Sequence, residues 1–157
     1  MATQGSGRTH RQSRVIKATP EEVYRAFVTP DAMSAWRAPM GMRMRVEAFE
    51  PREGGAFRLR LDYEGDDHGP GKSSAGADVV EGRFAALDPN RRIVERVDFQ
   101  SEDPAFAGTM TVTTTLTATA EGTEVSIRCD DVPPGIGESD HEAGMASSLE
   151  NLARYVE

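Results

Sequence analysis

The segment from Gly137 to Glu157 has the apolar spacing of one long amphipathic helix. Residues three and four positions apart stack on one face of a helix. Such a stripe runs through Met145, Leu149, Leu152 and Val156, with His141 one turn earlier on the same face. A single helix cannot bury this stripe by itself, and most of the preceding chain has the pattern of strands. The sequence therefore predicts a sheet that curves round the final helix.

The chain begins with the features of a tail, a short strand and a helix. Residues 1–12 are polar and are predicted to form a disordered tail. A strand is expected at about 13–18, carrying Val15 and Ile16. The run Thr19-Pro20-Glu21-Glu22 is typical of a helix start, because it offers a capping threonine, a proline at the first helical position and the glutamate of a capping box.

Two short helices are expected after this first strand. The first is predicted to span Pro20–Val28, because Thr29-Pro30 cannot continue it. Asp31 is then expected to cap the second helix, which brings Met33 and Trp36 onto one side.

From Met42 onward the apolar residues alternate with a period of two, the pattern of half-buried antiparallel strands. Strands are expected at about 43–49, 56–63, 79–87, 93–99, 109–119 and 124–130. Threonines fill the odd positions from Thr109 to Thr119, so this face of its strand is expected to be solvated. The segment Asp62–Asp78 is rich in glycine and charge and is expected to be a long mobile connection.

Size and charge limit the class of protein. A chain of 157 residues is close to one ordinary domain, which is expected to cover residues 13–157. A net charge of −8 argues against a nucleic-acid surface or a hold on anionic lipid, because both need a positive field. The single cysteine forms no internal disulfide, and no apolar run suits a membrane span or a signal peptide. A cytoplasmic protein is expected, with neither nucleic acid nor membrane as a partner.

The order of these elements resembles a known superfamily. The motifs that carry the resemblance are TPEEVYRAFVTPDAMSAW, EPREGGAFRL, GRFAALDPNRRIV, TVTTTLTATAEGTEVSI and HEAGMASSLENLARYVE. Together they resemble the SRPBCC superfamily of START-like proteins, and within it the branch named after the activator of the heat-shock protein 90 ATPase. The resemblance covers about Arg14 to Glu157 and implies an α+β helix-grip fold of the Bet v 1 type. Its members include lipid and hormone carriers, aromatase/cyclases and co-chaperones, so it specifies the fold more closely than the function.

The resemblance also implies a cavity between the curved sheet and the last helix, and for each residue the alternative is plain core packing. Met145 departs from the branch, which commonly has tryptophan there, and this is expected to enlarge or reshape the cavity. The residues expected to line the cavity are Trp36, Phe57, Leu59, Tyr63, Phe84, Phe99, Met110, Val112, Met145, Leu149 and Leu152.

Two polar residues are candidates for chemistry. Glu95 shares a strand face with Ile93, Val97 and Phe99, so it is expected to point inward, where burial would let it act as an acid or base. The alternative is a rim residue paired with an arginine such as Arg83, Arg58 or Arg96. His141 would be a donor or base at the cavity mouth, or else an exposed histidine in the first turn of its helix.

No metal or cofactor is expected. GPGKS at 69–73 lacks the earlier glycine of a phosphate-binding loop, and His141-Glu142 lacks the second histidine of a zinc protease. The acidic run at 66–68 fits no EF-hand, although it could meet a cation. One cysteine and three scattered histidines support neither a structural zinc site nor a nucleophile triad.

Three functions are consistent with these features. The first is binding of an apolar or aromatic small molecule between sheet and helix. The second is a cyclase or hydrolase that uses the same cavity, with Glu95 or His141 transferring a proton. The third is a co-chaperone-like contact, ranked last because the chain offers a single domain. A homodimer through an edge strand or the threonine face stays open.

Overall fold

The computed structural model describes residues 8–38, 42–63, 77–99 and 104–157. Its helices and strands are β1 (Thr9–Ile16), α1 (Pro20–Phe27), α2 (Pro30–Trp36), β2 (Met42–Phe49), β3 (Ala56–Tyr63), β4 (Ala77–Asp88), β5 (Arg92–Phe99), η1 (Pro104–Phe106), β6 (Met110–Thr119), β7 (Gly122–Asp130) and α3 (Glu138–Val156). The part of the 62–78 connection between β3 and β4 lies outside the described residues, so the expectation of a mobile segment stays a prediction.

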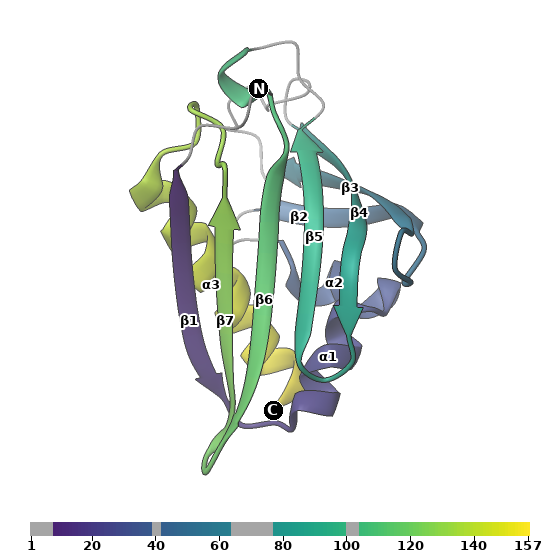
Figure 1. Cartoon of the computed structure of the whole chain (residues 1–157), viewed down its shortest axis with the longest axis vertical. Coiled ribbons are helices and arrows are strands. Elements are labelled where there is room, and N and C mark those ends of the chain that lie inside the picture. Colours follow the sequence, from purple (N-terminus) through teal and green to yellow (C-terminus); the bar gives the residue numbers. More distant parts are fainter. Residues whose placement is uncertain (1–7, 39–41, 64–76, 100–103) are drawn as a thin grey trace.

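The strands form one antiparallel sheet of seven strands in the order β1-β7-β6-β5-β4-β3-β2. Strands β2 to β7 follow one another as a meander, and β1 joins the free side of β7. In Figure 1 the strands β2 and β3 turn away from the direction of β6 and β7, so the sheet curls, while α3 runs behind β1 and β7. This arrangement confirms the predicted α+β helix-grip fold.

Helix α3 is the element round which the core is built. Met145, Leu149 and Leu152 are all buried, as the stripe predicted, and Ala153 is buried beside them. The helix packs against β1, α1 and α2. The buried residues of its apolar stripe are therefore covered by other elements of the fold and not exposed to solvent.

Helix α1 begins where its sequence predicts. The Thr19 side chain accepts a hydrogen bond from the Glu22 backbone N–H at 3.1 Å, and the Glu22 carboxylate accepts one from the Thr19 N–H at 2.9 Å. These two bonds complete the capping box. The helix ends at Phe27, with Val28 as its C-cap.

The predicted cap of α2 is wrong. Thr29 holds the N-cap position and Asp31 lies inside the first turn. Pro30 explains the difference, because a proline with its fixed φ fits the first helical position, which places the cap at Thr29, two residues before Asp31. The Thr29 hydroxyl donates to the Arg25 carbonyl at 2.7 Å and makes no capping bond.

Strand β1 begins earlier than the sequence predicts. It starts at Thr9, which pairs with Asp130, and it continues antiparallel to β7 up to Ile16. Residues 9–12, predicted as tail, are therefore strand, and residues 1–7 lie outside the described part. The apolar pattern missed this start because the buried residue there is His10 rather than an aliphatic side chain.

Candidate functional site

A cavity of about 490 Å³ lies between the inner face of the sheet and the helices. Its wall is largely apolar and receives side chains from all three helices and from β2 to β7. The residues that line it are Phe27, Trp36, Arg37, Met42, Met44, Leu59, Leu61, Val80, Val97, Phe99, Phe106, Met110, Val112, Thr114, Ile127, Cys129, Gly135, Ile136, Gly137, Asp140, His141, Gly144, Met145 and Ser148.

The residues predicted as lining divide into two groups. Those on the cavity wall are Trp36, Leu59, Phe99, Met110, Val112 and Met145. Those buried in the core away from the wall are Phe57, Phe84, Leu149 and Leu152. The side chain of Tyr63 lies outside the described part of the structure.

Packing explains why the second group leaves the wall. The rings of Phe57 and Phe84 lie 5.1 Å apart, and a Cβ on Gly82 would approach the Phe57 ring to 2.7 Å. Leu149 and Leu152 follow Ser148, the last residue of α3 that lines the cavity. These four side chains therefore pack in the core, and strand and helix periodicity cannot distinguish such core positions from positions on the cavity wall.

An ion pair lies in the wall of the cavity. Arg37, just after α2, donates to both carboxylate oxygens of Glu95 on β5, from Nη1 at 3.0 Å and from Nη2 at 2.8 Å. The Glu95 side chain is completely buried, whereas Arg37 is 19 % exposed and lines the cavity. Burial by itself would lower the pKa of Arg37, but the charge and hydrogen bonds of Glu95 outweigh burial and raise it. The pair is therefore a buried, bidentate and charged contact.

The partner of Glu95 differs from those named from the sequence. Glu95 does point inward, but Arg58, Arg83 and Arg96 belong to the opposite face of the sheet, where Arg58 pairs with Glu47 and Glu81. Sequence reasoning missed Arg37 because a polar residue after a helix carries no periodic signal. With both oxygens engaged by Arg37, the Glu95 carboxylate is poorly placed to take a proton from a ligand.

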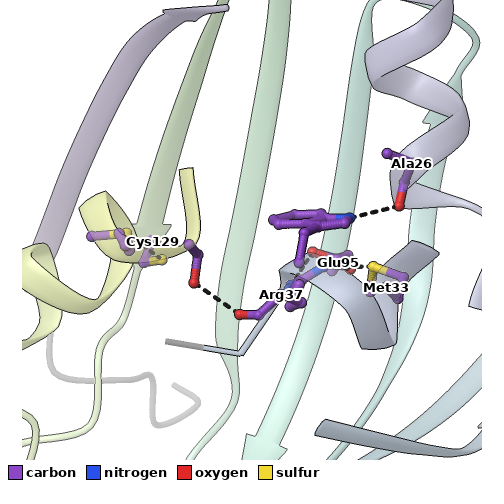
Figure 2. A network of polar contacts seen from close by, with 8 residues as sticks. Ala26, Met33, Arg37, Glu95 and Cys129 are labelled. Atoms are coloured by element: carbon purple, nitrogen blue, oxygen red, sulfur yellow. Dashed lines mark hydrogen bonds and ion pairs between the residues drawn. The ribbon is translucent and has the colours of Figure 1, made fainter. Parts of the chain in front are cut away.

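Neighbouring side chains hold Arg37 in place. The Ser148 hydroxyl on α3 donates to the Arg37 carbonyl at 2.8 Å, and the Trp36 indole N–H donates to the Ala26 carbonyl at 2.9 Å. Figure 2 shows these bonds converging on the end of α2, with Glu95 behind Arg37. The wall of the cavity is thus tied to α1, α3 and β5 at once.

His141 lines the cavity and contacts a second histidine. Its Nδ1 lies 2.7 Å from Nδ1 of His10, a buried residue of β1. An arginine can only donate, so the 3.3 Å contact from Arg8 makes Nε2 of His10 the acceptor. The proton of His10 is then assigned to Nδ1, and His141 accepts it. The predicted mouth histidine is therefore part of a contact that joins α3 to β1.

Cys129 is a packing residue of the wall. Burial raises the pKa of its thiol to about 12, although the charge of Arg37 acts in the opposite direction. Its sulfur lies 3.7 Å from the Met145 sulfur. Since the thiolate is the reactive form, this environment does not favour a nucleophile.

Thr114 is the second polar residue that sequence reasoning missed. It falls on the inward face of β6, between Val112 and Leu116, and is 1 % exposed. Its hydroxyl has no hydrogen-bond partner in the part of the chain that the structure describes. The expected solvated face consists of the odd-numbered threonines, so this even-numbered one should have been counted with the core.

Two further features concern metals and membranes. Across residues 8–38, 42–63, 77–99 and 104–157, no three histidine, cysteine or acidic side chains are grouped so as to hold a metal ion. None of the helices within those ranges combines the length and apolarity that a membrane crossing requires.

The chain matches a family model. The model described as "Activator of Hsp90 ATPase homolog 1-like protein" matches residues 17–157. No curated protein matches the sequence.

Solved structures share the fold. A protein from Chromobacterium violaceum is 31% identical, with a TM-score of 0.82, over 95% of this chain and 97% of the other. An AHSA1-like protein from Aeromonas hydrophila is 19% identical, with a TM-score of 0.73, over 95% of this chain and 92% of the other. A protein from Rhodobacter sphaeroides is 24% identical, with a TM-score of 0.72, over 98% and 91%.

Proposed function

The chain belongs to the family of activator of Hsp90 ATPase homolog 1-like proteins, and we propose that it binds a small apolar molecule between its sheet and α3. The observation that supports this most directly is the cavity of about 490 Å³ with a largely apolar wall. Small-molecule sites in proteins commonly have volumes of roughly 300–1,000 Å³, with mostly apolar walls and a few polar groups.

The cavity is a recess open to solvent, and its volume far exceeds that of a packing defect. Protein interiors are close-packed, and few voids in them exceed one water molecule. The side chains round the cavity are fixed from several sides, as the Arg37 pair and the bonds at the end of α2 show. Because these contacts fix the wall, the side chains are not free to move inward and fill the cavity, which supports ligand binding.

Catalysis in the same cavity has less support. Glu95 has both carboxylate oxygens on Arg37, and the thiol of Cys129 has a raised pKa. His141 accepts a hydrogen bond from His10 at its Nδ1, so this nitrogen is already engaged. A binding protein is therefore preferred over a cyclase or hydrolase.

A fluorescence titration tests the proposal. N-phenyl-1-naphthylamine is uncharged and becomes fluorescent in apolar sites, so it is expected to bind the wild-type protein saturably. Replacing Val97 and Val112 on the cavity wall by phenylalanine should weaken binding at least tenfold by filling the space. The same substitution at Val15, which is 44% exposed on β1, is the matched control and should have no effect.

Two results would contradict the proposal. One is the absence of saturable fluorescence with the wild-type protein. The other is equal probe affinity in the wild-type protein and the Val97→Phe, Val112→Phe variant. Circular dichroism on each variant establishes that a lost signal comes from a filled cavity and not from an unfolded chain.

A further inference from the structure

We propose that the ligand is an uncharged apolar molecule with one hydroxyl or carbonyl oxygen, which hydrogen-bonds with Thr114. This inference rests on the proposed function, because it names the chemistry of the molecule in the same cavity. Two observations support it. The hydroxyl of Thr114 in the cavity wall has no hydrogen-bond partner among the described residues, and the charged side chains of the wall favour an uncharged ligand.

Thr114 lies in the middle of an apolar surface. Its register partners on the two neighbouring strands are Ile93 on β5 and Ile127 on β7, and both are buried. Along its own strand the inward neighbours are Val112 and Leu116. Valine has nearly the same size and shape as threonine, so a valine would fit the space of Thr114 equally well.

The hydroxyl is costly for the unliganded protein. A buried donor that has lost water and gained no partner destabilises the folded state, whereas an apolar group of the same shape does not. The Oγ1 atom of Thr114 is shielded from solvent and has no partner among the described residues. Rotation about χ1 moves the hydroxyl to another staggered position, so a ligand oxygen in the cavity can bring the hydroxyl to the wall surface.

The charge of the wall favours an uncharged molecule. Among the wall residues that the structure describes, Arg37 is the one arginine or lysine, and Glu95 already pairs with it through both oxygens. Asp140 adds a negative charge near the start of α3, and the chain has a net charge of −8. An anionic ligand would therefore lose its hydration without gaining an unpaired cation, and a cationic one would lie beside Arg37 and find among these wall residues only Asp140, which is exposed to water, as a partner.

Three ligands with one ring system separate these alternatives. Naphthalene, 2-naphthol and 2-naphthoate are each titrated against the bound N-phenyl-1-naphthylamine. We expect 2-naphthol to displace the probe at the lowest concentration in the wild-type protein. The preference for 2-naphthol over naphthalene should fall about tenfold in Thr114→Val, because one hydrogen bond to a buried hydroxyl is removed.

Control variants separate recognition from folding. Thr114→Ser retains the hydroxyl and should retain the preference for 2-naphthol. Thr117→Val makes the same substitution at an exposed position of β6 and should change nothing. Thr114→Val should unfold at the same temperature as the wild-type protein or higher, because it loses an unpartnered polar group.

The outcomes distinguish this inference from the proposed function. If none of the three ligands displaces the probe, and the probe itself fails to bind, the proposed function is wrong. If they displace it but the preference for 2-naphthol is equal in wild type and Thr114→Val, only the inference is overturned. Tightest binding of 2-naphthoate, or strong thermal destabilisation of Thr114→Val, would also overturn it.

Discussion

Arg37 and Glu95 show what a single pair of residues contributes to the cavity. Glu95 could be placed on the inward face from the alternation of β5, and the structure has it there, completely buried. Arg37 could not be placed, because its position depends on how α2 packs against the sheet. The position of Glu95 could therefore be predicted from the sequence, whereas that of its partner Arg37 could not.

Glu95→Gln is expected to destabilise the protein by about 3 kcal/mol. Removing one partner of a buried ion pair leaves the other charge without compensation, which costs roughly 3–5 kcal/mol, and the partial exposure of Arg37 places this case at the lower end. Urea unfolding followed by circular dichroism measures the change.

Glu81→Gln is the matched control, because Glu81 pairs with Arg58 on the outer face and is 46% exposed. Its loss should cost less than about 1 kcal/mol. Equal destabilisation by the two substitutions would show that the Arg37 pair has no special importance for the fold.

Cys129 should react slowly with thiol reagents in the folded protein. Its pKa is raised from 9.0 to about 12 by burial, so at pH 8 the folded protein should alkylate roughly 1,000-fold more slowly than the urea-unfolded chain. Mass spectrometry of iodoacetamide adducts measures both rates. Rapid labelling of the folded protein would contradict the buried position of this thiol.

The same shift has a consequence for stability. The folded state holds the thiol proton more tightly than the unfolded state does. This contribution is complete below pH 9 and is lost as the pH rises towards 12, so stability should fall over that interval. Cys129→Ala should show a smaller fall, as measured by urea unfolding across the same pH range.

At the scale of the elements, local chemistry decided which boundaries could be predicted. The capping box of α1 involves residues three positions apart and was read directly from the sequence. The start of β1 depends on pairing with β7, more than a hundred residues away, and was missed. The strands with period-two alternation were located to within about two residues, since burial of one face produces that pattern.

Thr19→Ala should destabilise the protein by about 1 kcal/mol, because it removes the side-chain half of the capping box. Thr29→Ala is the comparison, since Thr29 occupies the N-cap of α2 without a side-chain capping bond. Thermal unfolding of the two variants should show the larger loss for Thr19. The reverse order would mean that the α1 cap contributes little to the fold.

At the scale of the whole molecule, the family resemblance predicted a cavity between sheet and helix. About half of the residues predicted to line it are on its wall in the structure. The sequence could not show which inward-facing residues pack in the core and which line the cavity. Phe57 and Phe84 share inward faces with residues of the wall, yet ring packing over Gly82 places them in the core. Arg37 was also missed, because it follows no apolar period, whereas Thr114 was missed because it is polar, although it occupies an inward position in the alternation of β6.

Native mass spectrometry of the purified protein tests most directly whether this cavity is a binding site. The wild-type protein and Val15→Phe should retain an added mass, either co-purified or from 2-naphthol supplied in excess, that is lost on denaturation. The Val97→Phe, Val112→Phe variant should lack it. The same added mass on all three proteins, or no added mass on any of them even with excess 2-naphthol, would contradict binding in the cavity.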